Sequence, residues 1–254
     1  MSICKISKVV RHMGNRAMIL AAGKGTRLRP WTDRKPKALM ECGGQTLLEY
    51  AIIKLRDAGY DHILINVHHF AEAIFGFVEA RDHFGIRIVF SDERDELLDT
   101  GGAIKKASWF FGNEPFPVYN VDIRSSIDLR SMVQSHLAKK ALVTLAVKDR
   151  PTSRNLLMGA GGQLGGWRDN RTGDTVLVGD TAEGLVPLAY SGIQVIDPAL
   201  SRFFPRERRF PVIPFYLELA GSQPVHLYRH DQDEWTDMGK KESYGINSAT
   251  EGPD

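Results

Sequence analysis

A glycine-rich segment near the amino terminus carries the residues best suited to chemistry. Gly23-Lys24-Gly25-Thr26-Arg27-Leu28-Arg29 follows a continuous apolar run over residues 17–22, and Lys37 comes shortly afterwards. Glycines let a backbone approach an anion closely, and a glycine-rich turn after a first strand is a common phosphate site. The four cations exceed what a monophosphate needs, but they suit a triphosphate whose charge moves onto a leaving pyrophosphate. We therefore predict a triphosphate site here, with a solvent-exposed basic loop around a structural turn as the alternative.

Two common phosphate-binding motifs do not match this segment. A Walker loop has the form Gly-x4-Gly-Lys-Ser/Thr, whereas the two glycines here are separated by one lysine and are not followed by a Gly-Lys pair. A dinucleotide-binding fingerprint requires a third small residue three positions after Gly25, where Leu28 stands. The spacing therefore excludes both motifs.

Short apolar runs alternate with segments of helical period through the first half of the chain, a pattern typical of strands joined by crossover helices. The clearest helix is predicted over residues 46–58, because its apolar residues share one face, Thr46-x-x-Glu49 forms a capping box and Gly59 follows. The other elements expected in this half are strands at 17–22, 62–67, 86–90, 116–123 and 141–148, and helices at 70–81, 100–111 and 129–140.

The second half has a different texture, with closely spaced glycines that are typical of hairpins. We expect strand structure between residues 157 and 167 and at 188–196 and 225–230, and a helix at 211–220. Together the two halves predict a single α/β domain, with a Rossmann-like, mixed but mainly parallel sheet flanked by helices. The crossover half would bind a nucleotide, and the mixed half would form the wall opposite.

Composition and charge exclude several classes of protein. With 254 residues, 43% of them hydrophobic and 25% charged, the chain has enough apolar material for a core. Residues 1–16 contain four of the 33 basic residues and no acid, which leaves 29 basic against 31 acidic residues in the body. Such a body offers no general nucleic-acid surface. We expect residues 1–16 to be a flexible basic leader.

The chain also lacks the signs of export or membrane insertion. The leader has no apolar run typical of a signal peptide, and no stretch approaches the roughly 18 apolar residues of a membrane span. The two cysteines, Cys4 and Cys42, are too few for a disulfide framework or a structural zinc site. We expect a cytoplasmic protein without membrane or nucleic-acid partners, and the sequence makes no prediction of its oligomeric state.

Several motifs lie in a fixed order between residues 17 and 247. They are Leu20-Ala21-Ala22-Gly23-Lys24-Gly25-Thr26-Arg27-Leu28-Arg29-Pro30, Pro36-Lys37-Ala38-Leu39, Gly44-Gln45-Thr46-Leu47-Leu48-Glu49, Leu98-Asp99-Thr100-Gly101-Gly102-Ala103-Ile104, Asn120-Val121-Asp122, Tyr190-Ser191-Gly192-Ile193 and Trp235-Thr236-Asp237-Met238-Gly239. In this order they resemble the motifs of the sugar-1-phosphate nucleotidylyltransferases, also called NDP-sugar pyrophosphorylases. The Asp-Thr-Gly-Gly segment, the short carboxyl terminus and Thr152-Ser153-Arg154 are most similar to the N-acetylmuramate-1-phosphate uridylyltransferase branch of peptidoglycan recycling.

The resemblance implies a catalytic domain over residues 17–250, with a nucleotide-binding half at 17–150 and a sugar-binding half at 151–250. The residues that it implies for nucleotide binding are Leu20, Ala21, Ala22, Gly23, Lys24, Gly25, Thr26, Arg27, Thr100, Gly101 and Gly102. Among these, residues 20–23 would meet the base, residues 25–27 would hold the triphosphate, and the two glycines at 101 and 102 would let the backbone approach base and ribose.

The resemblance also implies a catalytic set of Arg27, Lys37 and Asp122. Arg27 would hold the departing pyrophosphate, and Lys37 the α-phosphate or the sugar phosphate. Asp122 and Asp237 would hold Mg2+, which commonly takes one or two carboxylates and completes its coordination with phosphate oxygens and water. Asp122 read alone is equally consistent with a turn-forming acid at a strand end, and the second acid in a Trp-x-Asp-x-Gly context favours the metal.

One family feature is missing from the sugar-binding half. The Glu-Lys-Pro pattern that many members use to hold the sugar phosphate is absent near residues 148–151. The sugar-phosphate site is therefore assigned to Lys37, Arg154, Asn155, Ser191 and Gly192, with Arg154 as the substitute cation.

The expected reaction is Mg2+-dependent, in-line transfer of a nucleotidyl group from an NTP to a sugar 1-phosphate, giving NDP-sugar and pyrophosphate. UTP is the favoured donor and N-acetylmuramate 1-phosphate, of cell-wall recycling, the favoured acceptor. One alternative is a GTP-dependent mannose- or heptose-1-phosphate guanylyltransferase. An alternative of another class is a regulatory subunit that binds nucleotide-sugar without turnover.

Three other polar clusters have structural interpretations that we favour. Asp231-Gln232-Asp233 matches the Asp-x-Asp pattern of metal-dependent glycosyltransferases, but a solvated loop is expected because that function would leave the basic cluster unused. His68-His69 lacks a third zinc ligand at suitable spacing. The charged run over residues 92–96 is expected to be a solvated face that borders the site.

Overall fold

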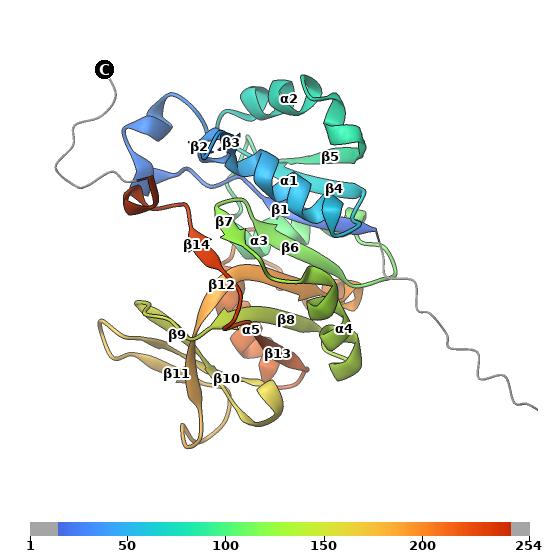
Figure 1. Ribbon diagram of the computed structural model, residues 1–254. Helices are drawn as coiled ribbons and strands as arrows, with labels where there is room; N and C mark the ends of the chain where they lie inside the picture. Colours follow the sequence, from blue (N-terminus) through green and yellow to red (C-terminus); the bar gives the residue numbers. More distant parts are fainter. Residues whose placement is uncertain (1–14, 245–254) are drawn as a thin grey trace, which may run out of the picture.

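The parallel half of the central sheet sets the position of the site. The computed structural model describes residues 15–244, and its main sheet has ten strands (Figure 1). Four strands are parallel neighbours in the order β5-β4-β1-β6, and they are β1 (Arg16–Leu20), β4 (His62–Val67), β5 (Arg87–Asp92) and β6 (Phe116–Asn120). The chain passes from β1 to β4 and β5 on one side and then crosses to β6 on the other. A crevice therefore opens outside the carboxyl ends of β1 and β6, where open α/β sheets bind ligands.

Burial on both faces explains why the first strand is an unbroken apolar run. Ala17 and Ile19 pack into one core, and Met18 packs into the core on the opposite face. The first core lies under helices α1 (Leu47–Asp57), α2 (Ala71–Glu79) and α4 (Leu129–Lys139). The second lies under α3 (Asp99–Lys106) and α5 (Val212–Ala220). Helices thus cover both faces of the sheet, as the α/β prediction requires.

The best-predicted element is α1. The hydroxyl of Thr46 accepts a hydrogen bond from the backbone N–H of Glu49 at 3.1 Å, which confirms the capping interaction at its start. Gly59 follows the helix with φ of 86°, a left-handed conformation that favours glycine. Strand β4 also has the predicted bounds, and β1 begins at Arg16, one residue earlier than expected.

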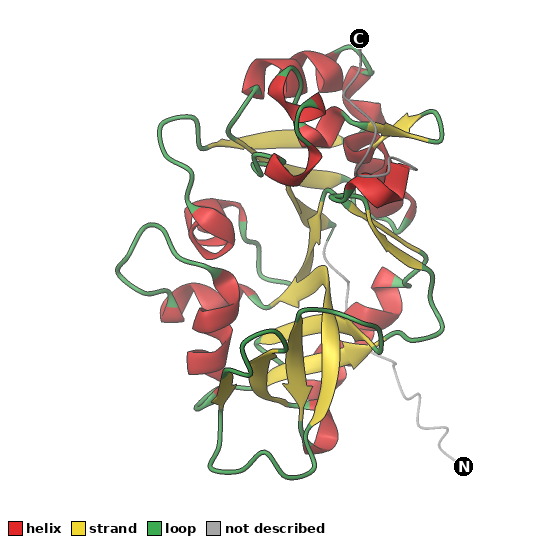
Figure 2. Cartoon of the chain, turned by 90° about the vertical axis from the view of Figure 1, so that its left-hand side faces the viewer, coloured by secondary structure: helices red, strands yellow, loops and turns green. Residues whose placement is uncertain are grey.

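The second half adds mostly antiparallel strands to the same sheet. These are β8 (Val143–Lys148), β9 (Arg154–Met158), β10 (Leu164–Asp169), β11 (Thr175–Leu177), β12 (Val186–Ile196) and β13 (Val225–Arg229). Strand β12 pairs antiparallel with β6 and joins the two halves, whereas β13 pairs parallel with β8. Figure 1 shows β9, β10 and β11 at the end of the molecule away from α1 and α2, and Figure 2 shows the same chain from the side with its strands and helices in separate colours. The mixed, mainly parallel sheet in one domain is confirmed.

Two small strand pairs were not predicted, and one of them matters for the site. Residues 116–123 form no single strand, because β6 ends at Asn120 and a separate β7 (Ile123–Ser125) begins after Asp122. Strand β7 pairs antiparallel with β14 (Trp235–Asp237). The other pair is β2 (Glu41–Cys42) with β3 (Gln45–Thr46). A strand of two or three residues is too short to show a hydrophobic period.

The ends of the chain and the helix lengths complete the description. The predicted leader lies outside the described residues apart from its last two positions, of which Arg16 already belongs to β1. Among residues 15–244, no helix is both long enough and apolar enough to cross a membrane. Helix α3 is shorter than predicted and ends at Lys106, where a 3-10 turn over Ala107–Phe110 follows.

Candidate active site

Two acidic residues that are distant in sequence meet at the break between β6 and β7. In the β7–β14 pair, Asp237 stands opposite Ile123, the residue that follows Asp122. The backbone N–H of Met238 donates to the carbonyl oxygen of Asp122 at 2.7 Å and fixes the two segments to each other. The short strand pair therefore places both carboxylates at the carboxyl edge of the parallel sheet.

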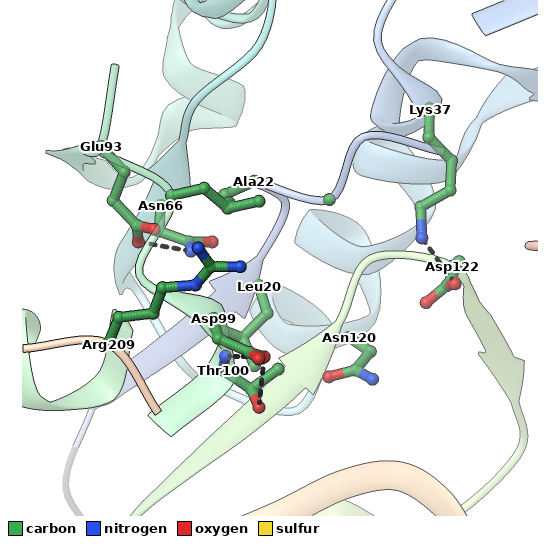
Figure 3. Close-up of a pocket in the computed structure, with 12 residues that line it drawn as sticks. Leu20, Ala22, Lys37, Asn66, Glu93, Asp99, Thr100, Asn120, Asp122 and Arg209 are labelled. Carbon is green, nitrogen blue, oxygen red and sulfur yellow. Dashed lines mark hydrogen bonds and ion pairs between the residues drawn. The ribbon is translucent and has the colours of Figure 1, made fainter. Parts of the chain in front are cut away.

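Two cations from the glycine-rich region contact this acid pair. The Lys37 ammonium lies 2.7 Å from Asp122 Oδ2, with both side chains nearly buried (Figure 3). The Arg27 guanidinium bridges the acids, with Nη1 at 3.3 Å from Asp237 Oδ2 and Nη2 at 3.9 Å from Asp122 Oδ2. The Arg27 side chain is 57% exposed, so its charge also faces solvent and any incoming anion. Two acids and two cations thus form one charge-balanced cluster.

A glycine makes room for this cluster. A Cβ at position 239 would lie 2.7 Å from Asp122 Oδ2, 2.7 Å from Arg27 Nη2 and 2.9 Å from Asp237 Oδ1. The Gly239 N–H donates to Asp237 Oδ1 at 2.8 Å and orients that carboxylate. Only a residue without a side chain lets the backbone pass so close to all three groups.

The first of three linked cavities has a volume of about 320 Å3 and lies over the carboxyl ends of β1 and β6. Its lining combines residues of β1, β4, β6 and α3 with residues of the segments outside these elements. The lining residues are Leu20, Ala22, Gly23, Lys37, Asn66, Glu93, Leu97, Asp99, Thr100, Asn120, Asp122 and Arg209. Figure 3 shows Arg209, Asn66 and Glu93 at one end and Lys37 with Asp122 at the other. The cavity therefore has a polar end away from the acid pair and a charged end at it.

A hydrogen-bonded pair of side chains forms the polar end. Asn66 accepts from the backbone N–H of Ala21 at 2.7 Å and donates to Glu93 Oε1 at 2.7 Å. The second oxygen of Glu93 accepts from the Leu98 N–H at 3.3 Å. Burial raises the pKa of Glu93 above its ordinary value, and these hydrogen bonds partly oppose the rise. The pair ties the ends of β1, β4 and β5 together beneath the cavity.

The second and third cavities lead from the acid pair into the mixed half. The second, of about 160 Å3, is lined by Arg27, Asn120, Asp122, Ile123, Arg150, Tyr190, Gly192, Trp235 and Asp237. The third, of about 850 Å3, lies between β9, β10 and α5 and includes Trp167, Leu177 and Leu217 in its lining. Tyr190 lines both the second and third cavities, and Thr100 lines the first and third. The acid pair thus stands where space for two ligands meets.

Many of the predicted site residues line these cavities. Leu20, Ala22, Gly23, Lys37, Thr100 and Asp122 line the first, Arg27, Gly192 and Asp237 line the second, and Arg154 with Asn155 line the third. Arg154 forms an ion pair with Asp169 at 3.4 Å, and Asn155 accepts from the Asn170 side chain at 2.5 Å. Arg154 does not reach the cavity of the acid pair.

Other predicted residues support the loop or the core instead. Ala21 binds Asn66 through its N–H, Gly25 packs against Thr32 at φ of 65°, and Thr26 begins a 3-10 turn. Lys24 is exposed and lines none of the three cavities, and Arg29 pairs with Asp33 at 3.2 Å. The basic cluster predicted around one phosphate is therefore reduced to Arg27 and Lys37 at the acid pair.

Three predicted site residues pack against other parts of the protein instead of lining a cavity. They are Gly101, Gly102 and Ser191. The N–H groups of Gly101 and Gly102 both donate to the Phe210 carbonyl oxygen, and a Cβ at Gly101 would lie 2.3 Å from the Phe210 ring. The absence of side chains at these two glycines lets the 208–210 segment pack directly against α3. Ser191 is fully buried and its hydroxyl lies 2.7 Å from His230 Nε2. None of these three residues lines the three cavities described above.

Sequence reasoning missed several cavity residues. Asn66, Arg150 and Arg209 were given no role, and Asn120 was quoted only as part of the Asn120-Val121-Asp122 motif. Asn120 is the last residue of β6 and Asn66 the last but one of β4, so both carried a positional signal. Glu93 belongs to the run expected to be a solvated face, yet it is only 1% exposed. That expectation was wrong for Glu93, because β5 extends to Asp92 and carries the next residue into the cavity.

The competing polar clusters have structural partners. Asp231 accepts from the Asp149 N–H at 2.7 Å and pairs with Arg229 at 2.6 Å, which fixes the loop after β13. His68 Nδ1 lies 2.6 Å from the Glu93 carbonyl oxygen. Neither cluster lines the three cavities.

Comparison with known proteins identifies a matching family and several relatives. Residues 16–158 match the nucleotidyl transferase family. The chain is 34% identical over 236 residues to an N-acetylmuramate alpha-1-phosphate uridylyltransferase of Caulobacter vibrioides, covering 85% of this chain and 91% of that protein. It is 28% identical over 245 residues to a UTP–glucose-1-phosphate uridylyltransferase of Synechocystis, covering 90% of this chain and 61% of that longer protein.

Solved structures share the fold. HddC from Yersinia pseudotuberculosis is 21% identical with a TM-score of 0.74, over 91% of this chain and 96% of that one. A UDP-glucose pyrophosphorylase from Acinetobacter is 18% identical with a TM-score of 0.70, over 90% of both chains. The fold is thus shared with these proteins over about nine tenths of this chain.

Proposed function

The chain belongs to the nucleotidyl transferase family, and from that premise we propose that it transfers a uridylyl group from UTP to a sugar 1-phosphate, giving UDP-sugar and pyrophosphate. The observation that carries the proposal is the meeting of cavities at Asp122 and Asp237, with Lys37 and Arg27 bound to them. A triphosphate in the first cavity and a phosphate entering from the third would meet at this cluster. A protein that only bound nucleotide-sugar would not need it.

The residues present fit Mg2+. Asp122 and Asp237 would be the protein's carboxylate ligands, because an oxygen of each lies within 2.9 Å of the point where a Cβ at position 239 would stand. Two carboxylates are enough, because Mg2+ binds hard oxygen ligands and keeps sites for phosphate oxygens and water. When bound there, the ion would neutralise charge on the phosphates that react.

The protein's own residues supply binding and charge rather than a base. The second pKa of a phosphate monoester is about 6, so a sugar 1-phosphate is already ionised at neutral pH. Its oxygen attacks the α-phosphorus in line, the bond to the bridging oxygen breaks and pyrophosphate leaves with that electron pair. Lys37 holds the α-phosphate, and Arg27, half exposed at the mouth, holds the departing pyrophosphate. Because no proton has to be removed, the site needs no catalytic serine, cysteine or histidine.

The substrate identity rests on finer grounds. UTP and N-acetylmuramate 1-phosphate are supported by the relative that this chain matches over 91% of its length. The large third cavity has an apolar wall that includes Trp167 and Leu177 and a cation, Arg154, at its surface. This wall suits a substituted sugar whose acidic group Arg154 would meet. The division into a nucleotide-binding half at 17–150 and a sugar-binding half at 151–250 stays a prediction. The cytoplasmic location and the role in cell-wall recycling are predictions too.

A panel of substrates tests the proposal. The purified protein is incubated with Mg2+ and each of UTP, GTP, CTP and ATP, together with N-acetylmuramate, N-acetylglucosamine, glucose or mannose 1-phosphate, and pyrophosphate is measured. We expect release with UTP and N-acetylmuramate 1-phosphate. Release only with GTP and mannose 1-phosphate would support the guanylyltransferase alternative, for which relatives of 30–36% identity over about half of this chain exist. No release with any pair would favour the regulatory alternative.

A further inference from the structure

One cation at the acid-pair cavity has no assigned task. Arg150 follows β8 and lines the same cavity as Asp122 and Asp237. It is half-buried, and it belongs to the segment where the Glu-Lys-Pro pattern is missing. The neighbouring Lys148 is committed elsewhere, because its ammonium binds the carbonyl oxygens of Asp231 and Asp233.

The Arg150 side chain is fixed in place by β12. Its Nη2 donates to the Tyr190 carbonyl oxygen at 2.8 Å, and its guanidinium carbon lies 3.7 Å from the centre of the Trp235 ring. The Trp235 indole donates in turn to the Ser191 carbonyl oxygen at 2.9 Å. The register of β12 against β8 shifts between Tyr190 and Gln194, so the two carbonyl groups lie at an irregularity of the strand. Stacking and hydrogen bonding thus pre-organise the guanidinium beside the cavity.

The charge of Arg150 is not neutralised by a carboxylate within ion-pair distance among residues 15–244. Two of its five N–H donors have acceptors there, the carbonyl oxygens of Pro151 and Tyr190, and its buried Nε has none. Burial lowers the pKa of Arg150, and the nearby charge of Asp237 partly restores it. A half-buried cation without a counter-charge is costly unless an anion binds it. Arg27, by contrast, already pairs with both acids.

The position of Arg150 decides which anion that is. It lines the cavity that shares Tyr190 with the large third cavity, and it does not line the nucleotide cavity. Arg154, the cation expected for the sugar phosphate, lines only the third cavity and pairs with Asp169. A phosphate that passes from the third cavity to the acid pair would therefore enter the cavity that Arg150 lines. The planar guanidinium can bind such a phosphate with two parallel hydrogen bonds.

We infer that Arg150 binds the phosphate group of the incoming sugar 1-phosphate and holds it beside Asp122 and Asp237. The inference rests on the proposed function and replaces Arg154 in that role. Loss of Arg150 should therefore weaken binding of the sugar 1-phosphate and leave binding of UTP and pyrophosphate unchanged, because other residues contact those two.

Steady-state kinetics of Arg150→Gln tests the inference, with Arg168→Gln as the matched control. Arg168 is exposed, binds Thr175 and lines none of the three cavities. For Arg150→Gln we expect the KM for the sugar 1-phosphate to rise at least tenfold, equivalent to about 1.4 kcal/mol. The KM for UTP, and the KM for pyrophosphate in the reverse reaction, stay within about twofold. Arg150→Lys keeps the positive charge but lacks the planar guanidinium. Its KM for the sugar 1-phosphate should therefore lie between those of the wild type and Arg150→Gln.

The outcomes separate this inference from the proposed function. If the wild-type protein releases no pyrophosphate with any substrate pair, the proposed function fails before the variants are compared. If the wild type is active but the sugar 1-phosphate KM is unchanged in folded Arg150→Gln or Arg150→Lys, the inference about Arg150 is overturned. The inference is also overturned if the KM for the sugar 1-phosphate rises in Arg154→Gln and not in Arg150→Gln. Thermal unfolding identifies a variant that fails to fold, in which case Arg150→Lys decides.

Discussion

Replacing Asp237 with asparagine separates charge from geometry at the acid pair. The Asp237 carboxylate accepts from the Gly239 N–H at 2.8 Å and from Arg27 at 3.3 Å, and its side chain is 17% exposed. An asparagine oxygen can still accept from Gly239, so the turn after β14 should persist. The change removes one negative charge from the proposed Mg2+ site, and with it the ion pair between Asp237 and Arg27.

The expected loss follows from the charges involved. Two unit charges about 4 Å apart interact by about 4 kcal/mol at an effective dielectric constant of about 20. If all of this interaction energy were lost from the transition state, the reaction would slow by about 10³-fold, because about 1.4 kcal/mol corresponds to a tenfold change in rate. Solvent reaches part of the site, so we expect kcat for Asp237→Asn to fall by about 10²- to 10³-fold.

Pyrophosphate release at saturating substrates, measured across a Mg2+ titration, is the assay. Asp33→Asn is the control, because Asp33 forms an exposed ion pair with Arg29 that should contribute little. We expect the control to keep its rate within about twofold and both variants to keep the wild-type melting temperature within a few degrees. A folded Asp237→Asn protein with a near-normal kcat and unchanged Mg2+ dependence would refute the two-carboxylate site.

The other predictions use neighbouring positions. Lys37→Gln should lower kcat at least 10²-fold in the same assay, because it removes the 2.7 Å contact at the acid pair, and a tenfold or smaller loss would contradict that role. Gly239→Ala should reduce activity at least tenfold, because the added Cβ would displace the carboxylates of the acid pair. Gly76→Ala is the control and should keep full activity, because a Cβ at that position of α2 meets no atom within 4 Å. Gly101→Ala should lower unfolding stability by about 1–3 kcal/mol in denaturant titration through its clash with the 208–210 segment, and an unchanged midpoint would contradict that packing. Hydrogen bonds from Arg171 and Arg154 lower the pKa of Asp169 to about 2. The stabilisation by its carboxylate should therefore be complete above pH 4 and disappear as pH falls toward 2. In denaturant titrations, Asp169→Asn should have a lower unfolding free energy than the wild type at pH 6, and this difference should shrink below pH 4.

The parallel half of the fold was predictable because its signals are local. The α1 boundaries follow from a capping box and a terminal glycine, and β1 and β4 follow from apolar runs buried on both faces. The mixed half was harder, since strands such as β11 and β14 have three residues each and are defined by their partners. Their pairing is a long-range property that hydrophobic period does not encode.

The site shows the same division. The family resemblance placed Arg27, Lys37, Asp122 and Asp237 around one phosphate site but did not predict their ion pairs. The pairing of β14 with β7 is the physical reason why the two acids lie together. The glycines of α3 and Arg150 could not be interpreted from sequence. A glycine needed for backbone packing looks the same as one needed for a ligand, and a functional cation depends on which carbonyl groups fix it.

The most direct test of the central claim is the yield of products from UTP, N-acetylmuramate 1-phosphate and Mg2+, with UDP-sugar and pyrophosphate quantified in the same reaction. Nucleotidyl transfer predicts that the two products appear in equal amounts and only when both substrates and Mg2+ are present. Release of pyrophosphate from UTP without the sugar 1-phosphate, or the absence of UDP-sugar for UTP and every sugar 1-phosphate tested, would contradict it.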